Sequence, residues 1–189
     1  MKTSLIAVLA LISINSFASI DNPLKSEHID FSKIVLNKYI EPRAEIIVEK
    51  IQSQEDNRVT AYFIFEKKIN DLDKKLIMHV FDLNGDGRMD MAKFFTNKTI
   101  VKAEYDLDYD GKVDDVSEYD PKTGELMKKT ISQGASNLWK YWHKGELRLM
   151  ETDRNNDKKP DMWVHYRKDK VVKTEVDSSY DGKSIKPVK

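Results

Sequence analysis

Cysteine is absent from this 189-residue sequence, and neither sign of charge is in excess. Without a thiol, the chain cannot form a disulfide, carry a lipid on a thioether or use a thiolate in catalysis. A chain exported without disulfides needs another source of stability, and a bound metal ion is one. The 32 basic and 32 acidic residues give a formal net charge of +0. That balance argues against a nucleic-acid-binding protein, which would need a clear basic excess.

Long hydrophobic runs are missing after the first 18 residues, so no later segment predicts a helix that spans a membrane. At the N-terminus, Lys2 precedes the apolar stretch 5–14 and the small-residue site 16–18. This order is typical of a cleavable secretory signal peptide, and the apolar stretch is too short to span a bilayer as a helix. The alternative is a buried N-terminal helix or strand. We expect a signal peptide at residues 1–18 and a periplasmic or secreted mature protein.

A catalytic constellation is missing as well. The histidines are isolated in the sequence and lack the spacing of metal ligands; they are His28, His79, His143 and His165. No nucleophile–base motif supports serine chemistry. Pairs of carboxylates are frequent, but the metal-binding pattern described next already accounts for them, so they give a glycosidase no independent support. We therefore expect no enzyme, and a hydrolase is the least favoured alternative.

The chain does contain repeated clusters of Asp, Asn and Gly. Loops 82–90 and 106–114 begin 24 residues apart, and both have oxygen-bearing side chains at positions 1, 3, 5 and 9. Calcium takes six to eight oxygen ligands, and loops of this type supply them from these positions and from the carbonyl of position 7. Glycine at position 6 allows the sharp turn. The predicted ligands are Asp82, Asn84, Asp86, Arg88 (carbonyl) and Asp90, then Asp106, Asp108, Asp110, Lys112 (carbonyl) and Asp114.

Three weaker copies continue the period. Loop 153–161 has Lys158 at position 6 and Pro160 before its last carboxylate, so metal and a plain turn remain equal alternatives there. The cluster that begins at Asp177 has Ile185 at position 9 and predicts a weak site or a turn. A degenerate copy that begins near Lys129 lacks carboxylates and is expected to bind nothing. The candidate ligands of the third loop are Asp153, Asn155, Asp157 and Asp161.

Short runs rich in β-branched and aromatic residues flank each loop and are separated by polar turns, which predicts strands joined in hairpins. The sequence therefore predicts an all-β fold, an antiparallel meander of repeated β-hairpins of about 24 residues, with calcium-type loops along one rim. Lysine-bearing turns should lie along the other rim. The expected strands are residues 91–95, 100–105, 115–119, 138–142, 147–152, 162–166 and 171–176.

Loops 82–90 and 106–114 resemble the Asp-x-Asp-x-Asp-Gly-x-x-Asp calcium loops that link β-strands in integrin-type propeller repeats and in many exported bacterial repeat proteins. The resemblance covers residues 76–185. It implies Ca²⁺ as the cofactor, held between strands. An EF-hand would instead have two helices and a glutamate at position 12, where this chain has Lys93 and Ser117. Ordinary turn chemistry is the alternative, because Asp, Asn and Gly also favour β-turns.

The remaining chain predicts a capping segment before the repeats. Residues 26–39 favour a short helix, and residues 44–51 and 59–65 read as strands. Repeat arrays commonly need such atypical ends to cover their apolar faces. We expect a signal peptide at 1–18, an N-terminal capping segment at 19–66 and a β-hairpin repeat region at 67–189.

Aromatic residues form a second constellation in two adjacent repeats. Because side chains alternate along a strand, Trp142 and Tyr166 should share one face, opposite to Trp139, Tyr141 and Trp163. Packing across strands is the simpler explanation, and an exposed platform for sugar rings or a partner protein is the alternative. The sequence thus favours an exported calcium-binding structural or binding module. A cell-surface protein or a polysaccharide is the candidate partner.

Overall fold

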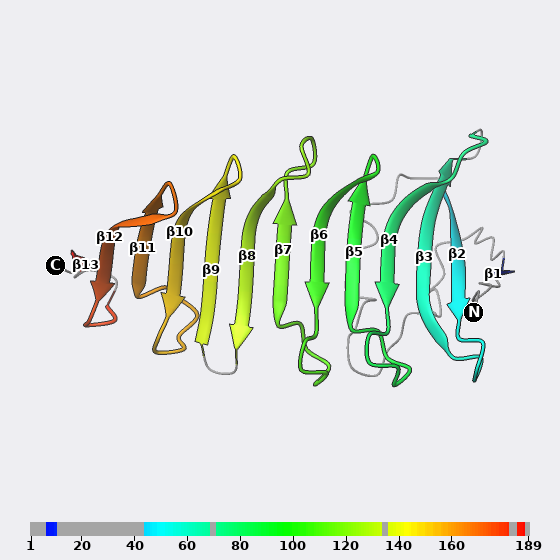
Figure 1. Cartoon of the computed structure of the whole chain (residues 1–189), viewed down its shortest axis with the longest axis horizontal. Helices are drawn as coiled ribbons and strands as arrows, with labels where there is room; N and C mark the ends of the chain where they lie inside the picture. The colour runs from blue at the N-terminus through cyan, green and yellow to red at the C-terminus, as the bar shows by residue number, and fades with distance from the viewer. Residues whose placement is uncertain (1–6, 11–43, 69–70, 134–135, 182–184, 188–189) are drawn as a thin grey trace. The chain divides into compact units, whose positions relative to one another are not determined.

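The computed structural model describes residues 7–10, 44–68, 71–133, 136–181 and 185–187. These residues form antiparallel β-strands, and the strand order in the sheet is the order of the chain (Figure 1). The predicted all-β meander of hairpins is confirmed. The described part of the chain contains no helix, and so none with the length and apolar character needed to cross a membrane. The predicted helix at 26–39 lies outside the described residues.

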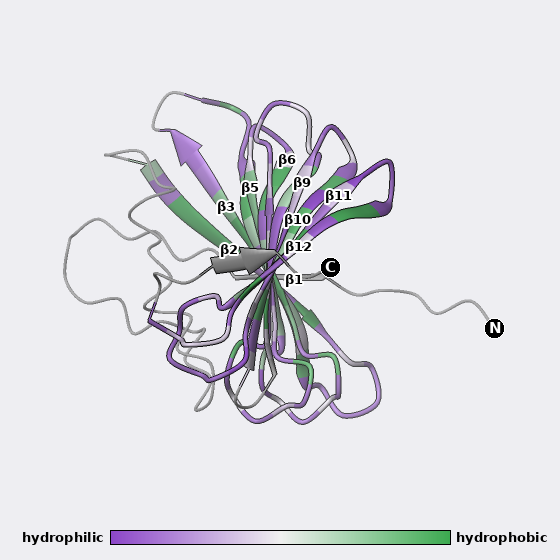
Figure 2. Ribbon diagram, turned by 90° about the vertical axis from the view of Figure 1, so that its left-hand side faces the viewer, coloured by the Kyte–Doolittle hydropathy of each residue, from purple (hydrophilic) through white to green (hydrophobic). Residues whose placement is uncertain are grey.

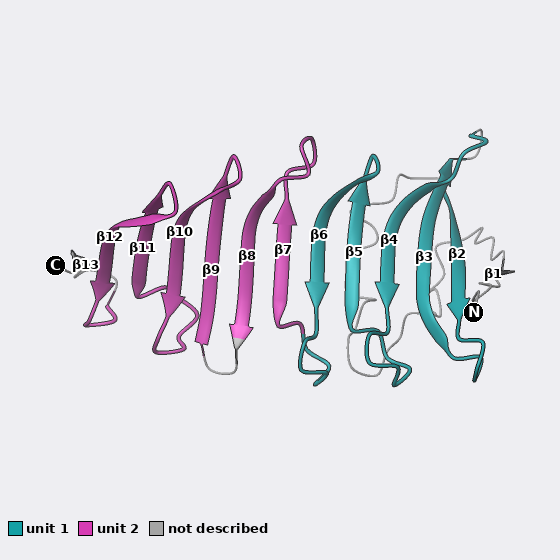
Figure 3. Cartoon of the chain, viewed as in Figure 1, with its two compact units in different colours: residues 1–112 teal, residues 113–189 magenta. Residues whose placement is uncertain are grey.

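The chain divides into two compact units, Met1–Lys112 and Val113–Lys189 (Figure 3). The predicted strands at 44–51 and 59–65 are present as β2 and β3. Strand β1 falls inside the predicted signal peptide and pairs with β2, while cleavage stays a prediction. The first unit contains β1 (Ala7–Ala10), β2 (Ala44–Gln52), β3 (Val59–Lys68), β4 (Lys75–Phe81), β5 (Met91–Thr96) and β6 (Thr99–Tyr105).

The second unit contains the later repeats. Each strand predicted there is present within a residue or two of the expected bounds, because runs of β-branched and aromatic residues favour extended backbone. Its strands are β7 (Asp115–Tyr119), β8 (Leu126–Gln133), β9 (Ser136–His143), β10 (Glu146–Asp153), β11 (Met162–Arg167), β12 (Lys170–Asp177) and β13 (Ile185–Pro187).

Two kinds of connection, tight turns and longer Asp-rich loops, recur among the hairpins. Tight two-residue turns join β5 to β6, β9 to β10 and β11 to β12, and both residues of each turn have positive φ. Turns of this kind match the right-handed twist of the flanking strands. Since antiparallel strands reverse direction at every turn, the longer Asp-rich loops lie at the opposite strand ends (Figure 1). The turn residues are Asn97 (φ 50°), Lys98 (69°), Lys144 (52°), Gly145 (74°), Lys168 (51°) and Asp169 (58°).

The degenerate copy near Lys129 is not a loop. Strand β8 continues to Gln133, and β9 begins at Ser136, so the two strands are joined by a short connection. Lys129 pairs with Lys140, and Ile131 pairs with Leu138. A stretch without carboxylates at positions 1, 3 and 5 cannot hold the loop backbone through side-chain acceptors. Strand pairing takes its place, as expected for β-branched residues.

The first unit has apolar side chains on both faces of its central strands. Ile64 pairs with Met78, which pairs with Phe94, and these three side chains are 1–2% exposed. On the other face, Phe63 pairs with His79. Burial of both faces explains why β3 to β5 are nearly continuous hydrophobic runs rather than alternating ones. Figure 2 shows this apolar character along the strands and hydrophilic residues at the turns and loops.

Candidate metal-binding loops

The aspartate at position 1 organises the backbone of each loop. In loop 82–90, the N–H of Gly85 donates to Asp82 Oδ1 at 2.6 Å, and the N–H of Gly87 donates to Asp82 Oδ2 at 2.9 Å. In loop 106–114, the N–H of Gly111 donates to Asp106 Oδ2 at 2.8 Å. One carboxylate therefore fixes the curvature of the loop from inside, as an Asx-type turn does on a smaller scale.

Positions 4 and 6 have left-handed backbone in each of the first three loops. The φ angles are 78° and 93° at Gly85 and Gly87, and 63° and 88° at Tyr109 and Gly111. Loop 153–161 has the same conformation without glycine, with 61° at Asn156 and 68° at Lys158. The three loops therefore share one backbone path, although the left-handed region is costly for a lysine.

Loop 106–114 brings carboxylates together. One oxygen from each of Asp106, Asp108 and Asp114 lies within 4.8 Å of the others, and within the described residues this is the one such group. Asp106 is 2% exposed, Asp114 is half-buried and Asp108 is exposed. Oxygen ligands with this convergence suit a hard cation such as calcium. These residues are three of the ligands predicted from the sequence.

Asp110, the predicted ligand at position 5 of the same loop, is held by Lys112. Its Oδ1 accepts the N–H of Lys112 at 2.8 Å, and its Oδ2 accepts Lys112 Nζ at 2.6 Å. The side chain of Lys112 is 80% exposed, so this ion pair is screened by water and contributes little. A divalent cation with higher charge density can displace it, which would free Asp110 for the ion.

Loop 82–90 places its candidate ligands differently. Asp90 is 2% exposed, and its Oδ2 accepts the N–H groups of Leu83 at 2.7 Å and Asn84 at 3.3 Å. Burial raises the pKa of Asp90, the two hydrogen bonds oppose that rise, and the charges of Asp82 and Asp86 add to it. A bound cation would relieve this repulsion. The carboxylates of this loop do not form a converging group of three within the described residues.

The amide at position 3 explains part of that difference. Asn84 Nδ2 donates to Asp86 Oδ2 at 3.1 Å, and Asn84 Oδ1 accepts the N–H of Asp86 at 2.9 Å. The N–H of Arg88, whose carbonyl is the predicted ligand at position 7, donates to Asp86 Oδ1 at 2.8 Å. The loop is therefore closed by hydrogen bonds, and its amide would have to present only its oxygen to an ion.

Loop 153–161 satisfies its first carboxylate without an ion. Asp153 is 0% exposed and accepts the N–H groups of Asn156 at 2.6 Å and Lys158 at 2.9 Å. Asn137 Nδ2, on β9, also donates to it at 3.4 Å. Burial opposes ionisation of Asp153, but these hydrogen bonds outweigh it and lower its pKa. Asn155 Oδ1 accepts the N–H of Asp157 at 3.1 Å.

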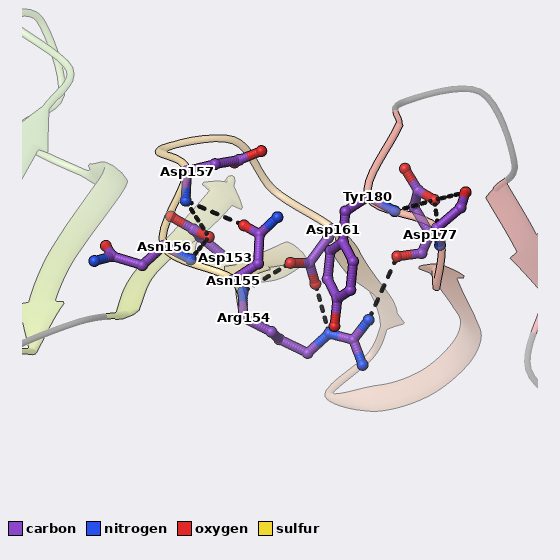
Figure 4. Close-up of polar contacts among 9 residues, drawn as sticks. Asp153, Arg154, Asn155, Asn156, Asp157, Asp161, Asp177 and Tyr180 are labelled. Atoms are coloured by element: carbon purple, nitrogen blue, oxygen red, sulfur yellow. Dashed lines mark hydrogen bonds and ion pairs between the residues drawn. The ribbon is translucent and has the colours of Figure 1, made fainter.

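The last carboxylate of this loop has a partner that the sequence analysis missed. Arg154 Nε donates to Asp161 Oδ1 at 2.5 Å, and the N–H of Arg154 donates to Oδ2 at 2.8 Å (Figure 4). The available signal was the residue type at position 2, which is Leu83 and Leu107 in the first two loops. The calcium-loop pattern places no ligand at position 2, so it gives no weight to the residue type there.

The cluster that begins at Asp177 is a tight turn in the described residues. Asp177 Oδ1 accepts the N–H of Ser179 at 3.1 Å, the Oγ–H of Ser179 at 2.8 Å and the N–H of Tyr180 at 3.0 Å. Ile185, at position 9, lies in β13 and pairs with Asp177. This arrangement supplies a single buried carboxylate, which is 2% exposed, and no closing ligand at position 9.

The aromatic constellation lies across β9, β10 and β11. Trp139 pairs with Glu151, which pairs with Trp163, so these side chains share one face. Tyr141 belongs to the same face, and its hydroxyl donates to Glu151 Oε2 at 2.9 Å. Both tryptophans are half-buried. Trp142 and Tyr166 follow Tyr141 and His165 directly, so they point to the opposite face.

Comparisons of the chain with protein-family models, with curated proteins and with solved structures found no match. The likeness of the loops to integrin-type calcium loops therefore stays a prediction.

Proposed function

We propose that this chain is an exported calcium-binding β-repeat protein that acts as a structural or binding module without catalysis. The observation that carries the proposal is the convergence of Asp106, Asp108 and Asp114, with one oxygen of each within 4.8 Å of the others. Like charges at this separation repel, and a divalent cation between them would neutralise the repulsion. Ligands that are all oxygens favour calcium over zinc or copper.

Calcium would act on the loop backbone as well as on its charge. Asp106 accepts the N–H of Gly111, and Lys112 donates its N–H to Asp110, so ligand side chains and loop backbone are already linked. An ion that fixes these carboxylates would also fix the path of the chain between the strands. Binding and stability would therefore be coupled.

The surroundings of the described histidines favour a non-catalytic role. His79 is enclosed between Phe63 and Phe81, with ring centroids 3.6 Å away in each case. His165 on β11 has its Nε2 2.9 Å from Oε2 of Glu175 on β12. Neither contact joins His79 or His165 to the converging carboxylates, so these two described histidines are not placed as a general base for them.

A calcium titration by calorimetry tests the proposal. The wild type should bind calcium with a Kd of roughly 10⁻⁴–10⁻³ M, and 10 mM calcium should stabilise the fold by about 1–3 kcal/mol. Asp108→Asn should remove the site of loop 106–114 and its share of this effect, because it removes a charged ligand without changing the side-chain shape. Asp169→Asn, in the turn between β11 and β12, is the matched control and should bind as the wild type does. No binding at millimolar calcium would refute the proposal.

The export part of the proposal is supported by the order of residues 1–18 and is tested separately. When the chain is expressed in a bacterium with residues 1–18 included, it should be recovered from the periplasm or the medium. Its N-terminal residue should then be Ser19. A protein that keeps Met1 and stays with the cytoplasmic fraction would contradict export and leave the calcium proposal intact.

A second candidate function is the binding of a polysaccharide or a partner protein by the aromatic face. The pairing of Trp139 with Glu151 and of Glu151 with Trp163 favours it, since two half-buried rings flank one acceptor. Trp163→Leu should abolish any shift of tryptophan fluorescence caused by polysaccharides. Trp142→Leu, on the opposite face, should preserve it. Equal responses of the two variants would remove this candidate.

A further inference from the structure

Loop 153–161 differs from the earlier loops at position 2. Loops 82–90 and 106–114 have Leu83 and Leu107 there, which are 48% and 55% exposed. In loop 153–161 the residue is Arg154. The backbone N–H of position 2 donates to the position-9 aspartate at 2.7 Å from Leu83 and at 2.8 Å from Arg154. The two side chains therefore start from equivalent places beside a buried carboxylate.

The guanidinium of Arg154 reaches three groups. Its Nε donates to Asp161 Oδ1 at 2.5 Å, and Asp161 is 3% exposed. Its Nη2 lies 3.5 Å from the carbonyl oxygen of Asp177, and its Cζ lies 5.5 Å from the centre of the Tyr180 ring. Figure 4 shows these contacts running from one loop to the next. An arginine is always charged and presents several donors in one plane, so it can serve all three groups together.

We propose that Arg154 is the resident cation of loop 153–161, which closes this loop without metal and ties it to the turn at Asp177. Both oxygens of Asp161 are occupied by donors of Arg154, one from its backbone and one from its guanidinium. A guanidinium beside the closing carboxylate also repels a second cation. The loop therefore remains empty at calcium concentrations that fill loop 106–114, and this last point rests on the proposed function.

Position 2 thus determines which loops depend on calcium. In loop 82–90, where position 2 is Leu83, the donors to the position-9 carboxylate of Asp90 are the backbone N–H groups of Leu83 and Asn84. An arginine supplies the missing positive charge within the chain. The acidic repeat can then be used in two ways, as a metal-dependent loop or as a metal-independent one.

Unfolding in chelator tests the role of Arg154 apart from calcium. Arg154→Leu, which installs the residue of the other two loops, should lower the melting temperature by roughly 3–6 °C. The matched control is Arg148→Leu, which removes the exposed pair of Arg148 with Glu146 at 2.8 Å. This control should shift the melting temperature by less than about 1–2 °C. Equal shifts for the two variants would overturn the proposal.

The calcium test uses Arg154→Leu again and adds two further variants. Arg154→Leu should be stabilised by calcium more than the wild type is, with one additional site in calorimetry. Leu83→Arg is a substitution at an exposed position that should not prevent folding. It should raise the melting temperature in chelator and remove one calcium site. An Asp157→Asn variant that loses a calcium site relative to the wild type would show that loop 153–161 is already filled, which would also overturn the proposal.

Different results would contradict the proposed function and the role of Arg154. If the wild type binds no calcium, the proposed function is wrong. The chelator comparison of Arg154→Leu with Arg148→Leu still decides whether Arg154 closes its loop. If calcium binds but the two variants unfold alike in chelator, the proposed function stands and the role of Arg154 falls.

Discussion

Both compact units bury carboxylates, but they differ in how many apolar side chains they bury. In the first unit, Ile64, Met78, Val80 and Phe94 are 0–2% exposed. In the described part of the second unit, Val164 is the one apolar side chain that is buried, at 5% exposed. The side chains that are more deeply buried there are the carboxylates of Asp153, Asp161 and Asp177, which are 0–3% exposed. The first unit has an apolar core, whereas the second relies on polar contacts at the strand ends.

This difference shows how one hairpin repeat can be stabilised in two ways. Burial of apolar surface stabilises the folded chain by roughly 25 cal/mol per Å². This contribution is available wherever apolar side chains pack against the strands. Buried carboxylates stabilise only when donors or a cation satisfy their charge, because burial alone disfavours the ionised form. The donors in the second unit come from loop backbone, from Asn137 and from Arg154.

The largest effect that separates the units should come from large-to-small substitutions. Phe94→Ala should destabilise the protein by about 3–5 kcal/mol, because a 2%-exposed ring leaves a cavity. Trp163→Ala removes a larger side chain from the second unit but should cost only about 1–2 kcal/mol, because that ring is half-buried. Urea unfolding of both variants gives the two values. A greater loss for Trp163→Ala would contradict the difference between the units.

Much of this architecture could be predicted from the sequence. The alternation of strand runs with Asp-rich loops set the bounds of β5, β6, β11 and β12 to within one residue, because a period of about 24 residues repeats both signals. The loop backbone was also predictable at Gly87 and Gly111, where the conformation requires positive φ. In these cases, the residue types within a single strand or loop were enough to predict the backbone.

The features that could not be predicted from the sequence depend on contacts between residues of different segments or on side-chain geometry. Arg154 meets Tyr180 in the next cluster of the chain, a contact that no spacing rule for a single loop contains. The copy near Lys129 kept the period but lost the loop, since the period alone does not say whether strand pairing will extend through a weak copy. The engagement of Asp110 by Lys112 likewise required side-chain geometry.

Between pH 5 and pH 8, one pH-dependent effect should come from the apolar core of the first unit. Burial of His79, with the charge of Lys93, lowers its pKa to about 4, and its Nε2 has no hydrogen-bond partner in the described structure. The unfolded chain takes up a proton near the usual pKa of 6.5, so stability falls as the pH drops from about 6.5 towards 4. His79→Phe should remove on the order of 1 kcal/mol of that loss at pH 5.

The matched control is His143→Phe in the second unit, at an exposed position at the end of β9. Thermal unfolding between pH 5 and pH 8 should show the wild-type slope for this variant and a flatter slope for His79→Phe. Equal slopes for the wild type and His79→Phe would show that His79 does not carry the pH dependence.

The smallest effect concerns backbone strain in the third loop. Lys158 has a φ of 68°, at the position that glycine occupies in the first two loops. Lys158→Gly should stabilise the protein by about 0.5 kcal/mol, since relief of strain exceeds the entropy that glycine loses on folding. Gly87→Ala, where φ is 93°, should destabilise it. Thermal unfolding in chelator measures both, and a loss of stability in Lys158→Gly would contradict the shared backbone path.

Terbium luminescence tests most directly whether loop 106–114 binds a metal ion. Terbium, like calcium, prefers oxygen ligands, and Tyr109 stands at position 4 of loop 106–114, where it can sensitise a bound ion. Excitation of tyrosine should give terbium emission that calcium displaces and that falls sharply in both Tyr109→Leu and Asp114→Asn. Emission that neither substitution reduces, or no emission at millimolar terbium, would contradict a metal site in this loop.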